Sequence, residues 1–208
     1  MLSPLIATIK MADNFLKLAV TDSVSKAQEH YFGEAQTFVG ALARDPLTQE
    51  EMDFIQKRDS FYMSTISENG WPYIQHRGGR AGFLRVLGPQ KLAFADYRGN
   101  RQMLSTGNLA ANNRVALFLM DYPQRTRLKI LGHARVEGAR QHPELVQQLA
   151  EPEARRIVER LFFIDVVTFD WNCPKYITPR YTSEEVQEVI APLKQRITDL
   201  EAQLKNSK

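Results

Sequence analysis

Short apolar segments separated by turn residues fill the middle of the chain and limit what it can fold into. Turn sequences such as Glu68-Asn69-Gly70 and Gly88-Pro89-Gln90 stand between them and are typical of tight hairpin connections. Strands at such short spacing favour a closed antiparallel barrel or a sandwich over a doubly wound parallel sheet. The apolar run at 161–171 predicts a last, central strand. The strands expected before it are 61–67, 71–76, 83–87, 91–95, 115–121 and 126–138.

Helices are expected on both sides of these strands. Thr48, followed three residues later by Glu51, has the capping-box pattern of a helix start, and residues 24–33 suit a helix that ends on a glycine. Residues 101–113 predict a short helix or turn, and residues 142–161 predict a charged helical excursion. We therefore expect a mainly β, α+β protein. Its predicted parts are a helical N-terminal extension (1–60), a barrel domain (61–180) and a C-terminal helical tail (181–208).

The tail helix, predicted from residue 183 to residue 208, carries apolar residues at alternating spacings of four and three. This is the pattern of a coiled-coil seam of about three heptads. Pro192 interrupts it, so we expect the helix to kink or restart there. Two interpretations stay open, a contact between subunits and packing on the helix's own domain. The seam residues are Val186, Ile190, Leu193, Ile197, Leu200 and Leu204.

Composition narrows the class of protein. With 208 residues, 43% of them hydrophobic, the chain can bury a full core. Its formal charge of +3 is spread along the sequence without a basic block, so nucleic-acid binding is not expected. Cys173 is the single cysteine, which fits a reducing compartment. We expect a cytoplasmic protein without membrane contact, since no signal-peptide pattern and no apolar run near the roughly 18 residues of a membrane span is present. No metal site is expected, because no cluster has ligand spacing.

Two polar corners follow apolar segments and carry arginine together with glycine. They are Gln75-His76-Arg77-Gly78-Gly79 and Asp96-Tyr97-Arg98-Gly99-Asn100-Arg101. A guanidinium can grip phosphate oxygens through two parallel hydrogen bonds, and glycine lets backbone N–H groups come close to a ligand. The pair therefore suits an anionic ligand with a flat aromatic part. The alternative is a pair of basic surface loops.

With these corners and the strand order around them, the chain resembles the pyridoxamine 5′-phosphate oxidase-like, FMN-binding split-barrel superfamily. The motifs RDSFYMST near the first strand and WNCPKYI near the end resemble its branch of predicted flavin-nucleotide-binding proteins. The likeness covers roughly residues 45–180, and FGEAQ and LTQEEMDFIQKRD extend it into the N-terminal zone. It implies a six-stranded antiparallel split barrel that forms a homodimer, with two FMN sites at the subunit interface.

The resemblance also implies the cofactor-binding residues. Leaving the second strand, Ile74-Gln75-His76-Arg77 would contact the flavin ring and ribityl chain and end on a phosphate ligand. After the fourth strand, Asp96 and Tyr97 take the ring-contacting positions, and Asn100-Arg101-Gln102 takes those of the phosphate clamp. Arg77 and Arg101 are the main phosphate ligands expected. Three C-terminal residues would reach the flavin only if their segment folds over it: Trp171, Asn172 and Lys175.

Three departures from the oxidase pattern bear on function. Gln102 replaces the clamp lysine, about three extra residues lie around Ser105-Thr106-Gly107, and Leu128 replaces a glutamine near the flavin. The C-terminal segment also lacks a match to the oxidase's contacts with vitamin B6. These departures favour flavin binding without vitamin B6 oxidation.

The sequence therefore predicts an FMN-binding flavoprotein, an oxidoreductase that acts on a small molecule by hydride transfer at flavin N5. Such a transfer needs no general acid or base, and no catalytic residue is assigned. Cys173 has no second cysteine and no activating base beside it. One alternative is a flavin-binding carrier or sensor without turnover. Another is a haem-binding protein on the same barrel, for which His76 and His133 are the nearby histidines.

Overall fold

The computed structural model describes residues 13–171 and 174–206. These residues fall into two compact units, which are described separately below. The first unit contains residues 13–120 and 127–171, and the second contains residues 121–126 and 174–206. Among the described residues, no helix is both long and apolar enough to cross a membrane.

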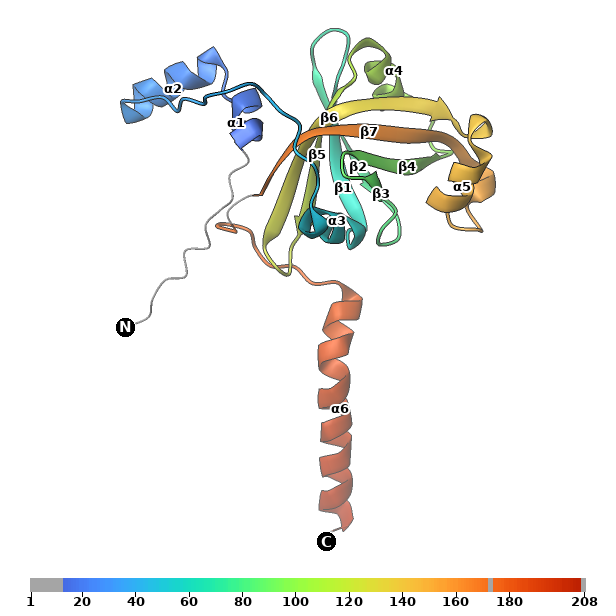
Figure 1. Cartoon of the computed structure of the whole chain (residues 1–208). Helices are drawn as coiled ribbons and strands as arrows, with labels where there is room; N and C mark the ends of the chain where they lie inside the picture. Colours follow the sequence, from blue (N-terminus) through green and yellow to red (C-terminus); the bar gives the residue numbers. More distant parts are fainter. Residues whose placement is uncertain (1–12, 172–173, 207–208) are drawn as a thin grey trace. The chain divides into compact units, whose positions relative to one another are not determined.

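A seven-stranded sheet with the order β2-β1-β5-β6-β7-β4-β3 is the main feature of the fold (Figure 1). Each strand coincides with a segment expected from the sequence. The mainly antiparallel fold with flanking helices is confirmed, but the sheet has seven strands and is not closed, whereas the resemblance implied six. The short strand β3 pairs with β4 alone and leaves an open edge. The strands are β1 Ser60–Ile66, β2 Pro72–Gly78, β3 Arg85–Gly88, β4 Lys91–Tyr97, β5 Arg114–Asp121, β6 Thr126–Gly138 and β7 Val158–Trp171.

Alternation along the strands builds the main core. In β1, Phe61 and Met63 are buried while Tyr62 between them is exposed, as expected for side chains that point to opposite faces of a sheet. Phe94 of β4 stacks on Phe162 of β7 at 4.8 Å between ring centroids. A second, smaller apolar cluster lies where helix α5 (Pro143–Leu149) packs on β4 and β7.

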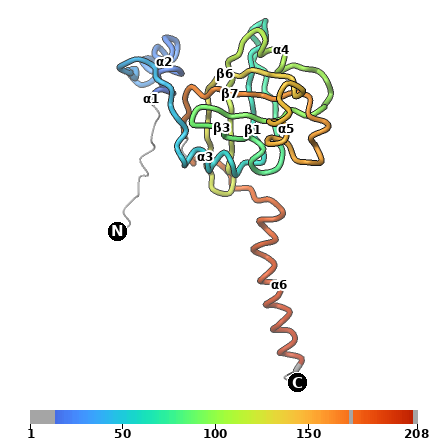
Figure 2. Tube along the Cα trace, turned by 45° about the vertical axis from the view of Figure 1, so that its right-hand side comes forward, coloured from blue at the N-terminus to red at the C-terminus, as the bar shows by residue number. Residues whose placement is uncertain are grey.

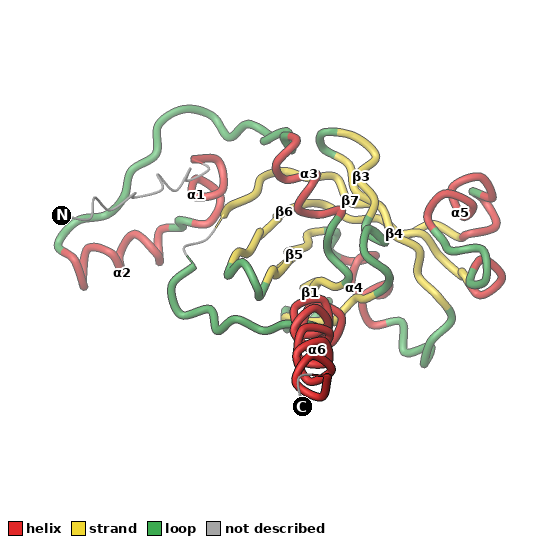
Figure 3. Tube along the Cα trace, turned by 90° about the horizontal axis from the view of Figure 1, so that it is seen from below, coloured by secondary structure: helices red, strands yellow, loops and turns green. Residues whose placement is uncertain are grey.

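The N-terminal helices are α1 (Asp13–Ala19), α2 (Asp22–Phe32) and α3 (Gln49–Gln56), and a long loop joins α2 to α3 (Figure 3). The capping box at Thr48 is confirmed, and α2 ends at Gly33, whose φ of +82° suits glycine. Figure 2 places α1 and α2 at one end of the first unit and α5 at the other. The segment 101–113 contains a short helix, α4 (Leu104–Ala111).

The second unit consists mainly of helix α6 (Ser183–Asn206), which continues through Pro192. Thr182 and Glu185 cap its start reciprocally, the Thr182 N–H donating to Glu185 Oε2 at 2.8 Å and the Glu185 N–H to Thr182 Oγ1 at 3.1 Å. The Arg180 guanidinium lies 5.0 Å from the centre of the Tyr122 ring.

Candidate functional site

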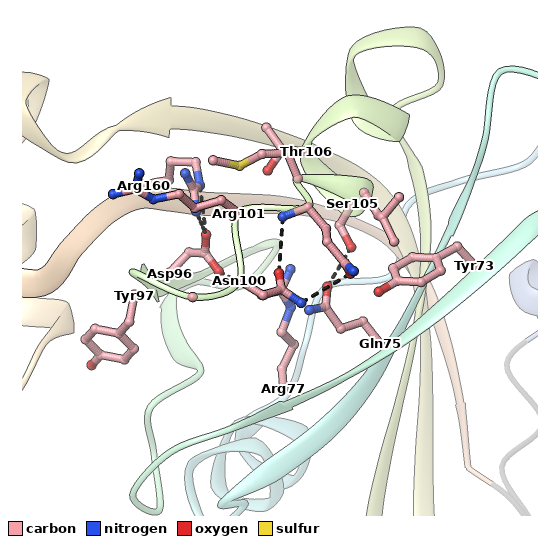
Figure 4. A pocket seen from close by; sticks show the side chains of 14 residues that line it. Tyr73, Gln75, Arg77, Asp96, Tyr97, Asn100, Arg101, Ser105, Thr106 and Arg160 are labelled. Atoms are coloured by element: carbon pink, nitrogen blue, oxygen red, sulfur yellow. Dashed lines mark hydrogen bonds and ion pairs between the residues drawn. The ribbon is translucent and has the colours of Figure 1, made fainter.

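A cavity of about 280 Å³ lies where β2 and β4 end, beside the loop that follows β4 and the start of α4 (Figure 4). Both Arg- and Gly-bearing corners of the sequence contribute to it. Its wall contains three arginines and one aspartate, so the lining carries a formal charge of +2. The lining residues are Tyr73, Gln75, Arg77, Asp96, Tyr97, Gly99, Asn100, Arg101, Gln102, Met103, Leu104, Ser105, Thr106 and Arg160.

Asp96 links two of the arginines. Its Oδ1 atom lies 2.7 Å from Arg77 Nη1, and its Oδ2 atom lies 2.8 Å from Arg160 Nε and 2.7 Å from Arg160 Nη2. Asp96 and Arg160 are opposite each other in the β4–β7 register. Arg77, by contrast, comes from β2 at the far edge of the sheet. The sheet must therefore curl so that β2 approaches β4, and this curl creates the cavity.

The three side chains of this cluster are largely buried, with exposures of 14% for Arg77, 12% for Asp96 and 18% for Arg160. Burial lowers the pKa of Arg77, and the charge and hydrogen bond of Asp96 oppose that shift. The Arg77 guanidinium also lies 5.0 Å from the centre of the Phe162 ring. Among the described residues, the buried Arg77 Nε has no hydrogen-bond partner. The cluster thus holds a cation with spare donor capacity at the cavity wall.

The loop after β4 presents the third arginine. Arg101 and Met103 have φ values of +60° and +56°, which only a constrained loop imposes on residues other than glycine. The Asn100 side chain stabilises the bend, because its Oδ1 accepts a hydrogen bond from the Gln102 N–H at 3.2 Å. Arg101 itself is exposed and has no hydrogen-bond or ion-pair partner within residues 13–171 and 174–206. It is therefore free to meet an anion.

Neutral polar side chains complete the wall. Ser105 Oγ donates to Gln75 Oε1 at 2.9 Å, which ties α4 to β2, and Figure 4 shows these two side chains directed toward each other. Burial raises the pKa of Tyr97, and the nearby charge of Glu151 raises it further. Figure 4 shows the Tyr97 ring directed away from Arg77, Gln75 and Ser105, and this ring packs on the second apolar cluster.

Seven of the twelve residues expected to bind the cofactor line this cavity. They are Gln75, Arg77, Asp96, Tyr97, Asn100, Arg101 and Gln102. Ile74 and His76 lie on the opposite face of β2, because neighbouring residues in a strand point to opposite sides. Ile74 is exposed there, and the His76 ring lies edge-on to Tyr62.

The expected C-terminal contacts lie elsewhere. The Trp171 indole N–H donates to Glu51 Oε1 at 2.7 Å, and its ring packs edge-on against Phe54, so this side chain supports α3. Lys175 belongs to the second unit, where its ammonium lies 5.1 Å from the Tyr176 ring centre. Asn172, like Cys173, lies outside the described residues. The flavin contacts of these residues, and the homodimer expected from the resemblance, stay predictions.

Sequence reasoning missed Arg160, Tyr73 and the role of Ser105 in the site. Tyr73 could have been predicted from the sequence, since it is two residues before Gln75 and therefore lies on the same face of β2. Arg160 has no signal that a single sequence reveals, because its place beside Asp96 depends on the pairing of β7 with β4.

Within the described parts of the chain, no group of three histidine, cysteine, aspartate or glutamate side chains could hold a metal ion.

Several solved structures are similar to this chain. The H111A variant of HupZ from Group A Streptococcus is 16% identical, with a TM-score of 0.47 over 61% of this chain and 99% of that one. An FMN-binding protein from Syntrophomonas wolfei is 10% identical, with a TM-score of 0.42 over 60% and 88%. The haem storage protein HutZ from Vibrio cholerae is 14% identical, with a TM-score of 0.44 over 60% and 93%. A search of curated proteins finds no match.

The sequence model of the pyridoxamine 5′-phosphate oxidase family matches residues 47–164, which is more than half of the chain. The match begins just before the capping box of α3 and extends into β7. It therefore includes β2, β4, the loop after β4 and α4, the four parts that line the cavity, together with Arg160. The chain belongs to the pyridoxamine 5′-phosphate oxidase family.

Proposed function

We propose that the cavity binds the phosphate end of FMN and that the protein is a flavin-dependent oxidoreductase acting on a small molecule. The observation that carries this proposal is the lining of the cavity, in which two arginines pair with Asp96 and a third, Arg101, has no partner among the described residues. Its formal charge of +2 matches a phosphate dianion. The buried Arg77 Nε, left without a partner among the described residues, fits a site whose donors await an anion.

Arg160 offsets the departure at Gln102. The family clamp implied by the resemblance has a lysine at that position, and its replacement removes one cation from the loop. Arg160, from β7, lines the same cavity and brings a guanidinium in its place. The site thus keeps three cationic groups, although one of them comes from a different element.

The size of the cavity indicates which part of the ligand it takes. At about 280 Å³ it is slightly smaller than the roughly 300–1000 Å³ typical of ligand pockets, which suits the phosphate and the chain leading to it. A second cavity of about 1020 Å³ shares Thr106 and Arg160 with it and offers room for a ring and a substrate. When bound, FMN supplies hydride transfer at its N5 atom, and this chain supplies placement and electrostatics.

The chain's own residues have distinct parts in this proposal. Arg77 and Arg160, held by Asp96, form the fixed wall, and Arg101 closes on the anion from the loop. Ser105 and Gln75, joined by a hydrogen bond of 2.9 Å, form the neutral part of the wall. Haem is less well supported, because neither His76 nor His133 lines this cavity and His133 Nδ1 is paired with Asn113 Oδ1 at 2.9 Å.

Titration of the protein with FMN, followed by quenching of flavin fluorescence, tests the site. Replacing Arg101 by alanine should weaken binding by about 2–5 kcal/mol if the bound phosphate buries the charge pair that it forms with Arg101. Arg98→Ala is the matched control, because Arg98 lies in the same loop but outside the cavity and pairs with Glu159 at 3.2 Å. A wild-type protein that takes up no FMN, or equal losses in both variants, would refute the assignment.

A second measurement separates enzyme from carrier. Anaerobic addition of NADH or NADPH to the FMN-loaded protein should bleach the flavin absorbance, and a small-molecule acceptor should restore it. A loaded protein that stays oxidised with both donors would instead support the carrier or sensor. The visible spectrum of the purified protein distinguishes flavin from haem directly.

A further inference from the structure

Helix α6 carries a continuous apolar row. The row consists of Val186, Ile190, Leu193, Ile197, Leu200 and Leu204, which follow one another at spacings of four and three residues. Five of the six are exposed, Val186 by 39%, Leu193 by 59%, Ile197 by 56%, Leu200 by 41% and Leu204 by 69%. The residues of the second unit therefore leave an apolar face more than five turns long without cover.

A helix of this kind needs a partner. Most of the stability of helices in proteins comes from packing of an apolar face rather than from the intrinsic propensity of their residues. Pro192 lies inside α6 and weakens it further, since proline lacks the N–H of one helical hydrogen bond. Something must therefore bury the row.

The residue types along the row point to a second copy of the same helix. When the sequence of α6 is written in heptads, the a positions are Ile190, Ile197 and Leu204. The d positions are Val186, Leu193 and Leu200. β-Branched residues at a with leucine at d favour parallel, two-stranded coiled coils. Pro192 is at a c position, on the side away from this seam.

The charges beside the seam agree with a parallel, in-register pair. In such a pair a g residue faces the e residue five positions later on the other helix. Arg196 is at g and Glu201 is at e, so two copies bring opposite charges together on both sides of the seam. The preceding pair of this type, Val189 with Lys194, brings no like charges together.

We propose that α6 is a self-association element that forms a parallel, two-stranded coiled coil with α6 of a second copy of this chain. This contact is separate from the arginine-lined cavity and does not depend on flavin binding. The tail would then link two copies of the chain.

Disulfide trapping in the full-length chain tests the arrangement. Cys173 is the only cysteine, so Cys173→Ser gives a thiol-free background. In that background Leu204→Cys places equivalent thiols opposite each other at an a position, and oxidation should give a band at twice the chain's mass on a non-reducing gel. Ala202→Cys, at an f position on the far side, is the matched control and should stay a monomer. An antiparallel pair would not bring residue 204 against itself.

Charge reversal tests the register. Arg196→Glu should lower the cross-linked fraction of the Leu204→Cys protein, because it places like charges beside the seam. Adding Glu201→Arg should restore it. No cross-link at 204, equal cross-links at 202 and 204, or failure of the double reversal to restore the band would each overturn the proposal. The first of these would mean that the chain's own folded part or another protein covers the row.

Discussion

Replacing Asp96 by asparagine should leave two buried guanidiniums without their shared counter-ion. Asp96 contacts both Arg77 and Arg160 at distances of 2.7–2.8 Å, and none of the three side chains is more than 18% exposed. Asparagine keeps the size of the side chain and one acceptor oxygen, so the change removes charge and leaves packing almost intact. The expected effect is therefore electrostatic.

Its magnitude follows from the burial of the cluster. Removing one partner from a buried ion pair typically lowers the free energy of unfolding by about 3–5 kcal/mol. Because asparagine retains one hydrogen-bond acceptor, we expect a loss of about 3 kcal/mol for Asp96→Asn. A domain of this size loses about 2–4 °C in Tm for each kcal/mol, so the variant should melt about 6–12 °C below the wild type. Solvent screening should lower this value only slightly, because the ion pairs are largely shielded from water.

Urea and thermal denaturation of the ligand-free protein measure the loss. The control is Glu151→Gln, which removes a salt bridge to Arg80 whose side chains are 72% and 42% exposed, and it should change stability by no more than about 1 kcal/mol. Added inorganic phosphate should restore part of the Tm of Asp96→Asn, because it supplies the missing negative charge. Equal stability of Asp96→Asn and wild type, or no response to phosphate, would refute this account of the cluster.

Two further predictions concern the fold. Burial tends to raise the pKa of Glu51, but its three hydrogen bonds outweigh burial and lower it. A lowered pKa adds stability above the unfolded value of about 4.3 and loses it as the pH falls. Glu51→Gln should therefore cost about 1–3 kcal/mol at pH 7, with the gap to wild type narrowing below about pH 4 in urea melts. Gly132→Ala should cost about 1–3 kcal/mol by the same assay, because its Cβ would lie 2.6 Å from the Asp165 carbonyl oxygen, whereas Gly107→Ala in α4 meets nothing and should stabilise. Equal effects of the two alanines would contradict the steric argument.

Local patterns predicted most of the fold. The strands expected at 61–67 and 126–138 correspond to β1 and β6, and the capping box at Thr48 is at the start of α3. Such features are set by a few neighbouring residues, so a single sequence contains them. All seven strand segments were expected, but the open edge of the sheet was not predicted, because it depends on the pairing of β3 with β4 alone and on how far the sheet curls.

The site was predictable where its residues follow one another in the chain. Arg77 and Arg101 stand in the two corners, and both line the cavity. Residues 74–77 were all expected to contact the cofactor, but side chains in a strand alternate between its two faces. Gln75 and Arg77 therefore face the cavity while Ile74 and His76 do not. Trp171 lies apart from the cavity because Glu51, on α3, provides a hydrogen-bond acceptor for its indole N–H.

The cavity depends on a contact between strands that are distant in the sheet. β2 is an edge strand and β4 lies next to the other edge, so no backbone pairing joins them. The Arg77–Asp96 ion pair and the Arg77 guanidinium over Phe94 and Phe162 connect their side chains. The residues that close the curled sheet are thus the same residues that present positive charge to the cavity. Under the proposed function, this shared use accounts for the costly buried charge cluster, since an apolar replacement that held the strands together would leave no cation for a phosphate.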